Sequence, residues 1–287
     1  MAVTNEAVSA GIAPAGRGWW RDRATLLTGA AVWTLAAAAW VGVALQAWGA
    51  RGTGQGMETQ SMPMSMPGSS VSFAGALAFI GAWGVMMAAM MLPSATPMIA
   101  LYGTVSRNLS RSGKRVVPLA LFAATYLVVW LAFGVPVYAA GAVVDALVRA
   151  EPALAGLLPY AVALVLLAAG GYQFSALKRV CLRACQSPLS FLMTRWRSGY
   201  AGTLRVGLAH ALYCVGCCWG LMAVLVGAGA MGLNWVLLIA AVVFAEKLLP
   251  RGEWTARLVG AALVMLGLVV LVQPGLALVL RGQPMAM

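Results

Sequence analysis

The residues best suited to chemistry are three cysteines in the segment Cys214-Val-Gly-Cys-Cys218, which follow the single histidine of the chain, His210. A helix advances about 100° per residue, so the side chains at positions 210, 214, 217 and 218 fall on one side of a helix. Thiolates and an imidazole on one face are a ligand set for a soft metal such as Cu(I) or Zn. Gly216 and Gly220 fall on the opposite side, where small residues let a second helix approach. The spacing predicts a metal site that faces the interior of a helix bundle.

A structural role for these cysteines is the alternative. Cysteine behaves as a small apolar residue that is often buried, so one cysteine in an apolar helix is usually a packing residue. The combination of Cys214, Cys217 and Cys218 one turn after His210 favours a function, because ionisable groups inside a membrane helix usually have one. Cys181 and Cys185 lie upstream in a basic segment, and their role is not predicted. None of the five cysteines falls in an outer loop, so no disulfide is expected.

Methionine forms a second sulfur-rich region, since nine of the 16 methionines lie between Met57 and Met98. One group comes just before a proline in an apolar segment and consists of Met86, Met87, Met90 and Met91. Another lies in the polar segment 61–67, Ser-Met-Pro-Met-Ser-Met-Pro. Thioethers select Cu(I) over harder ions. Methionine also fills irregular gaps between helices, so packing in the first group and a simple linker in the second stay open as alternatives.

Membrane helices must position these residues, because the composition excludes a soluble protein. Of the 287 residues, 62% are hydrophobic and 9% are charged, whereas a soluble domain carries about 25% charged residues. A spanning helix needs about 20 mostly apolar residues, since its backbone amides must be paired inside lipid. We predict an all-α, polytopic transmembrane helix bundle over residues 26–280, with about seven spans at 26–48, 72–102, 116–140, 154–177, 205–230, 233–249 and 258–280. The sixth of these spans is the shortest.

The basic residues predict the orientation of the bundle. With the N-terminus inside, 16 of the 19 Lys and Arg residues fall on the cytoplasmic side, as the positive-inside rule requires, and seven spans place the C-terminus outside. The net charge of +12 then follows from topology and from the lipid bilayer as partner, and no nucleic-acid partner is expected. We predict a multi-pass protein of the cell inner (plasma) membrane. No oligomeric state is predicted.

The segments outside the spans have simpler compositions. Residues 1–25 predict a disordered cytoplasmic tail, residues 49–71 a flexible Met-rich outer loop, and residues 281–287 a short outer tail. Because the second span descends from outside and the fifth rises from inside, the methionines at 86–91 and the cysteines at 214–218 are expected at similar depth near the midplane of the membrane.

One acidic residue, Glu246, lies near the end of the sixth span, next to Lys247. Its predicted depth is close to that of His210. A carboxylate there could pair with Lys247 or another cation, orient the imidazole of a metal ligand, or relay a proton. A plain ion pair is the structural alternative.

Four motifs, in order along the chain, resemble the DUF2182 family of predicted metal-binding integral membrane proteins. They are Met-Met-Ala-Ala-Met-Met-Leu-Pro, Cys-Leu-Arg-Ala-Cys, His-Ala-Leu-Tyr-Cys-Val-Gly-Cys-Cys-Trp-Gly-Leu-Met and Ala-Glu-Lys-Leu-Leu-Pro, between about residues 72 and 250. The resemblance implies metal binding at the matching positions, which are Met86, Met87, Met90, Met91, His210, Cys214, Cys217, Cys218 and Glu246. The Met-rich segment 61–67 is outside the resemblance.

No enzyme is predicted, because the sequence has no phosphate-binding loop, nucleophile elbow or haem attachment motif. The leading hypothesis is a membrane protein that handles Cu(I), with zinc as the other suitable metal, either by transport or by delivery to a cuproenzyme or from a metallochaperone. One alternative is a non-transporting subunit or assembly factor of a membrane oxidoreductase. Another is a transporter or scaffold in which the cysteines are structural.

Overall fold

The structure is a computed structural model that describes residues 23–52, 73–111, 119–197, 199–227 and 233–280. Within these ranges the chain is predominantly helical and contains no β-strand. The elements, in chain order, are α2 (Arg23–Gly52), α3 (Phe73–Arg111), α4 (Leu119–Ala150), η2 (Pro152–Leu157), α5 (Leu158–Gln173), α6 (Ala176–Gln186), α7 (Pro188–Arg195), α8 (Gly199–Gly227), α9 (Leu233–Leu248), α10 (Gly252–Val272) and α11 (Leu276–Leu280).

Six helical segments of the described chain are long and apolar enough to cross a membrane, at Thr25–Ala47, Phe73–Arg107, Leu119–Ala150, Pro152–Gln173, Gly199–Gly227 and Gly252–Val272. The seventh apolar helix, α9, has 16 residues. At 1.5 Å per residue it is about 24 Å long, which is less than the roughly 30 Å hydrocarbon core. It nevertheless packs against α3, α8 and α10. The prediction of an all-α, polytopic membrane bundle is confirmed, and the six candidate spans of the described residues roughly match the expected seven. The orientation of the bundle stays a prediction.

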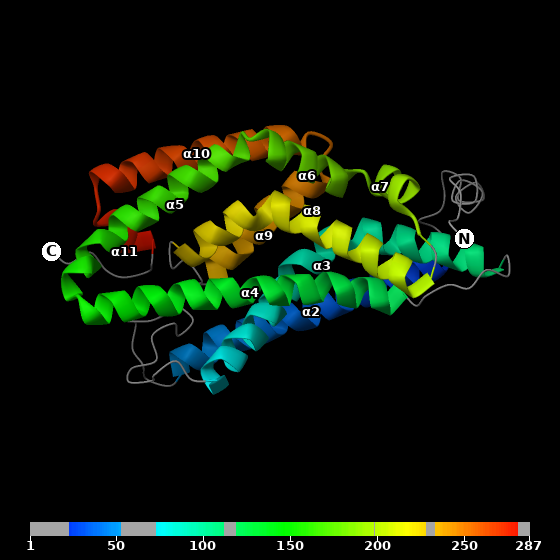
Figure 1. The fold of residues 1–287 in the computed structure, drawn as a ribbon, viewed down its shortest axis with the longest axis horizontal. Coiled ribbons are helices and arrows are strands. Elements are labelled where there is room, and N and C mark those ends of the chain that lie inside the picture. The colour runs from blue at the N-terminus through cyan, green and yellow to red at the C-terminus, as the bar shows by residue number, and fades with distance from the viewer. Residues whose placement is uncertain (1–22, 53–72, 112–118, 198, 228–232, 281–287) are drawn as a thin grey trace.

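The helices are arranged around α8 and α9 (Figure 1). The α5 and α10 helices run side by side along one edge of the molecule, and α2 lies at the opposite edge against α3. The α4 helix lies between α3 and α8 and contacts both. The α8 helix packs against α4, α5, α6 and α9, and many of its buried residues belong to the larger of two apolar clusters.

Glycines allow the closest helix contacts. A Cβ atom on Gly170 of α5 would lie 2.9 Å from the Gly260 carbonyl oxygen of α10, so the two backbones touch at this point. On the back of α8, a Cβ on Gly216 would lie 2.7 Å from the Cys181 sulfur of α6, and one on Gly220 would lie 3.7 Å from the Ala169 Cα of α5. The glycines opposite the cysteines therefore let α6 and α5 pack closely against α8, as small residues do between membrane helices.

Two short helices, α6 and α7, occupy the stretch between the predicted fourth and fifth spans. The α6 helix starts at Ser175, whose hydroxyl accepts a hydrogen bond of 3.1 Å from the Lys178 backbone N–H, which is a common N-cap arrangement. The α7 helix starts with Pro188, a residue that suits the first position of a helix. The α6 helix is amphipathic and lies outside the candidate spans, and it packs on α8.

Several expected boundaries move in the structure. The α3 helix continues through Pro93 and Pro97 to Arg111, and α4 continues to Ala150. The α10 helix begins at Gly252 and ends at Val272, before the expected limit of the last span. Most of the predicted N-terminal tail (residues 1–22), most of the predicted Met-rich loop (residues 53–72) and the predicted outer tail (residues 281–287) lie outside the described residues.

Candidate metal centre

The three cysteines of α8 form a compact group of thiols. The sulfur atoms of Cys214, Cys217 and Cys218 all lie within 4.8 Å of one another, and each residue is only 1% exposed. The Cys217 and Cys218 sulfurs are 3.2 Å apart. With metal–sulfur bonds of about 2.3 Å, three sulfurs around one ion lie about 4 Å apart in a planar trigonal arrangement. The group, called the thiol trio below, can therefore surround one soft ion after small side-chain movements.

A lysine ammonium group lies against the trio. Lys247 Nζ of α9 is 3.0 Å from the Cys214 sulfur, 3.1 Å from Ser94 Oγ and 3.9 Å from the Met91 sulfur. The lysine is 6% exposed. A positive charge next to a thiol stabilises its thiolate, the form that binds metals. Sequence reasoning considered Lys247 only as a partner of Glu246, because the two are neighbours in the chain, and so missed this contact.

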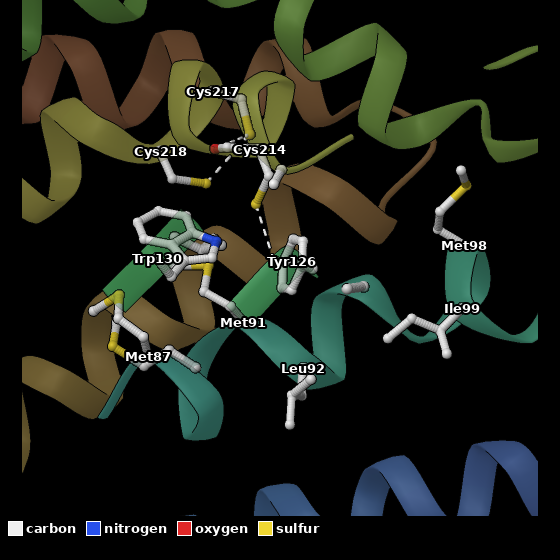
Figure 2. Packing of buried hydrophobic residues seen from close by; sticks show 14 of the residues in the cluster. Met87, Met91, Leu92, Met98, Ile99, Tyr126, Trp130, Cys214, Cys217 and Cys218 are labelled. Atoms are coloured by element: carbon white, nitrogen blue, oxygen red, sulfur yellow. Dashed lines mark hydrogen bonds between the residues drawn. The ribbon is translucent and has the colours of Figure 1, made fainter. Parts of the chain in front are cut away.

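A tyrosine of α4 is the second neighbour of the trio that was missed. The hydroxyl of Tyr126 lies 3.0 Å from the Cys214 sulfur, and the residue is fully buried. Figure 2 shows the thiols of α8 facing Tyr126, Trp130 and Met91. Aromatic residues at 122, 126 and 130 of α4 are all buried, and their four-residue spacing was a usable signal that this helix has one face in the core.

The predicted methionine ligands are all in the core of α3. Met86, Met87, Met90 and Met91 are each no more than 2% exposed. Met91 borders the metal centre, since its sulfur contacts the same ammonium group as Cys214. Figure 2 places Met87 on the far side of Trp130 from Cys218. Coordination of a metal by any of the four methionines stays a prediction.

His210 is buried one turn before Cys214, in an aromatic environment. Its ring is stacked on Tyr126 at 5.6 Å and on Phe122 at 6.0 Å, and Phe191 meets it edge-on at 5.7 Å. The Nδ1 atom is buried and has no hydrogen-bond partner. His210 is not in the group whose ligand atoms lie within 4.8 Å of one another. Its role as a ligand stays a prediction, and the partnerless nitrogen is the feature that supports it.

Glu246 pairs with a cation from another helix and not with its chain neighbour. Its carboxylate is 2.6 Å from Lys178 Nζ of α6 and accepts a 3.1 Å hydrogen bond from Gln173 Nε2 of α5. Lys178 also donates to the backbone carbonyl of Cys217. Burial lowers the pKa of Lys178, but the Glu246 carboxylate and nearby cysteines raise it more, so its net shift is upward. This buried ion pair joins α6 and α9 to the backbone of the thiol trio.

A fourth thiol lies beside the trio. The sulfur of Cys185 on α6 is 3.8 Å from the sulfur of Cys217. The side chain is half-buried, and all five cysteines of the chain are free. Lys178, Cys181 and Cys185 follow a helical spacing of three and four residues, which places them on one face of α6. That spacing is visible in the sequence, whereas the nearness of this face to Cys217 is not.

The chemistry of the donors fits a soft monovalent ion better than a hard one. Three thiols and a nearby thioether suit Cu(I), and thiols alone also suit zinc. The carboxylate that a harder ion would require, Glu246, is already engaged by Lys178 and Gln173. The adjacent ammonium group offsets part of the negative charge that three thiolates would bring into an apolar interior.

Comparison with known proteins gives one family. Residues 80–270, which are 191 of the 287 residues, match the sequence model of the PpoB2 family, described as a copper chaperone. The matched range contains the thiol trio, Met91, Lys247 and Cys185. No curated protein matches the chain significantly, and no solved structure does. The copper description agrees with the expected metal binding, while the resemblance to DUF2182 itself stays a prediction.

Proposed function

The chain belongs to the PpoB2 copper chaperone family, and on this premise we propose that it holds Cu(I) on Cys214, Cys217 and Cys218 inside the membrane and delivers it to a cuproenzyme. The observation that carries the proposal is the meeting of three buried thiol sulfurs within 4.8 Å of one another. A family described as a copper chaperone supports a carrier of metal, and no catalytic function is proposed.

The surroundings of the trio support this cargo. Cu(I) bound by three thiolates has a net charge of minus two, which is costly to bury without a counter-charge. The ammonium of Lys247, 3.0 Å from the Cys214 sulfur, supplies one positive charge inside the site. Cu(I) accepts low coordination numbers with soft donors, so the trio provides a complete set of ligands, and Met91 provides a neutral one.

Delivery is preferred to transport because, among the His, Cys, Asp and Glu side chains of the described residues, the thiol trio is the one group of three with close donor atoms. A single metal-binding site can hold an ion and hand it over, whereas transport across the membrane requires further binding sites along the path. The buried methionines of α3 next to the trio are the feature that would serve transport. We place the protein in the plasma membrane as a multi-pass protein, with a cuproenzyme as the acceptor of the metal.

Copper content tests the proposal directly. Protein purified in detergent under reducing, anaerobic conditions and supplied with Cu(I) is expected to retain it stoichiometrically, as measured by mass spectrometry of the metal. The triple variant Cys214→Ser/Cys217→Ser/Cys218→Ser should lose the metal, and Cys181→Ser should keep it, because Cys181 faces Gly216 on the back of α8. Wild-type protein without copper would show that the cysteines are structural.

Flux and transfer measurements separate the remaining functions. Delivery predicts that wild-type proteoliposomes take up no Cu(I) beyond the stoichiometric amount that the protein binds, while loaded protein gives its copper to an apo-cuproenzyme. Accumulation that depends on the trio would replace delivery by transport. Bound copper that is neither accumulated nor given up would indicate a static site, as in a subunit of a membrane oxidoreductase.

A further inference from the structure

The structure points to Cys185 as the exit ligand of the copper site: we infer that Cu(I) leaves the thiol trio by passing to the Cys185 thiol while it stays attached to Cys217. The inference rests on the proposed function and adds a route to it. It concerns a cysteine on α6, outside the candidate membrane spans, to which neither the family description nor the sequence patterns give a role.

The first argument is the short distance between the Cys185 and Cys217 sulfur atoms. The sulfurs of Cys185 and Cys217 are 3.8 Å apart. Two sulfurs that bind the same ion in a trigonal arrangement lie about 4 Å apart when each metal–sulfur bond is about 2.3 Å. Cys217 is also 3.2 Å from Cys218 in the trio. An ion held by the trio can therefore gain Cys185 as a ligand without leaving Cys217.

The different exposure of the four thiols gives the direction in which copper is transferred. Each thiol of the trio is 1% exposed, so an acceptor protein cannot reach it without opening the bundle. Cys185 is half-buried, and it is the most exposed of the four sulfur ligands. Exposed basic residues of α6, Arg179 and Arg183, lie on the outer side of the same helix. Of the four thiols, Cys185 is therefore the one that an acceptor can reach with the least opening of the bundle.

The contacts of α6 hold Cys185 in this position. Lys178 binds both the Glu246 carboxylate at 2.6 Å and the Cys217 carbonyl. Gln186, the residue after Cys185, donates a 2.7 Å hydrogen bond to the Glu246 carbonyl. Arg183 of the same helix pairs with Glu253 of α10 at 2.5 Å. These bonds fix α6 on α8, α9 and α10, so the short distance between the two sulfurs is a property of the packed helices.

The transfer is a ligand exchange without a change of oxidation state. A bond from copper to the Cys185 sulfur forms, and a bond from copper to Cys218 or Cys214 breaks. The proton of the Cys185 thiol ends on the sulfur that is released, so protons balance and copper remains Cu(I). Cys217 keeps its bond to copper throughout the exchange. A thiol of the acceptor then repeats the exchange at Cys185.

Transfer kinetics test the inference. Wild-type protein, Cys185→Ser and Cys181→Ser are loaded with Cu(I) and mixed in a stopped-flow instrument with excess bathocuproine disulfonate, a coloured Cu(I) chelator. We expect Cys185→Ser to keep stoichiometric copper and to release it at least tenfold more slowly than the wild type. Cys181→Ser, a change of the same size on the same face of α6, should release copper at the wild-type rate.

Two results would overturn this role. Release from Cys185→Ser at the wild-type rate would show that copper leaves by another route. Loss of bound copper from Cys185→Ser during purification would show that the metal cannot be retained without Cys185, which would make Cys185 a required ligand of the site and not an exit ligand. Failure of the proposed function looks different, because the wild-type protein itself would then bind no copper.

Alkylation gives an independent readout of the same contact. One equivalent of Cu(I) should slow the reaction of Cys185 with iodoacetamide at least fivefold in the wild type, as measured by peptide mass spectrometry, because the Cys185 sulfur donates a lone pair to copper held at Cys217 and is then a weaker nucleophile. In the triple serine variant of the trio the same Cu(I) should give no protection. Equal protection in both proteins would mean that copper binds Cys185 adventitiously, and it would contradict the inference.

Discussion

At the scale of single residues, Lys247 places a positive charge directly against a thiol of the candidate metal centre. Its ammonium group contacts Cys214, Ser94 and the Met91 sulfur, so it joins the thiol side of the site to the thioether side. Burying a lysine ammonium group costs free energy unless a negative charge lies nearby. A thiolate at Cys214, the thiol in contact with Lys247, would provide that charge, and the lysine in turn favours the thiolate form.

Removal of this charge should weaken copper binding. For Lys247→Met, which keeps a long apolar side chain, we expect the affinity for Cu(I) to fall about tenfold, or about 1.4 kcal/mol. The reason is that the charge of the copper–thiolate group loses its buried counter-ion. Competition with a chromophoric Cu(I) chelator at constant pH measures the change. A matched apolar change outside the site, Leu208→Met on the exposed side of α8, should leave the affinity unaltered, and an unaltered affinity in Lys247→Met would refute the counter-ion role.

At the scale of elements, pairs of helices are fixed by backbone contacts at glycine and by the ion pair of Lys178 with Glu246. The ion pair is 1% exposed on both sides and connects α6 to α9, while the lysine also reaches a carbonyl of α8. Three helices around the site, α6, α8 and α9, therefore share one polar junction. Because a buried charge without its partner is costly, this junction determines which arrangement of α6 is stable.

The contact between α5 and α10 gives a matched pair of substitutions. In Gly170→Ala the new Cβ would lie 2.8 Å from a methyl group of Val264 and 2.9 Å from two backbone atoms, the Gly260 oxygen and the Val264 nitrogen. We expect destabilisation by about 1–3 kcal/mol, because the helices must move apart. The neighbouring Gly171→Ala meets nothing within 4 Å and should stabilise the helix by about 0.5–1 kcal/mol. Thermal unfolding in detergent compares them, and equal melting temperatures would contradict this packing.

At the scale of the whole molecule, the ligand-bearing helices lie at the centre of the bundle and the short helix α9 ends beside the metal centre. Its last turn contributes Glu246 and Lys247, and α10 begins after a brief turn at Gly252. A helix of 16 residues is too short to cross the hydrocarbon core without thinning the bilayer or taking help from its flanks. This shortness brings two charged residues to the level of the thiol trio.

Whether α9 counts as a span decides where the C-terminus lies. The distribution of Lys and Arg predicts the N-terminus inside and the C-terminus outside. Fusions of a reporter that is active on only one side of the membrane, placed at each terminus in turn, should therefore give opposite results. A fusion after Arg197, in the segment before α8, should report the same side as the N-terminus. Both termini on one side would show that α9 does not cross.

The sequence by itself determined the relations within each helix. Composition established a helical membrane protein, and helical periodicity placed Cys214, Cys217 and Cys218 on one face with small residues behind them. These results follow from the regular geometry of a single helix, in which spacing along the chain sets direction. Residue type also predicted a soft-metal ligand set, because the softness of a sulfur donor does not depend on its surroundings.

Only the tertiary structure decided the relations between helices. Adjacent residues Glu246 and Lys247 point to different partners, one to Lys178 of α6 and the other to Cys214 of α8, and no pattern in the chain distinguishes them. The contact of Cys185 with Cys217 joins two helices whose relative position depends on packing at Gly216 and on the buried ion pair of Lys178 with Glu246. Such distances result from the balance of many contacts across the bundle, so they are fixed only when all the helices are in place.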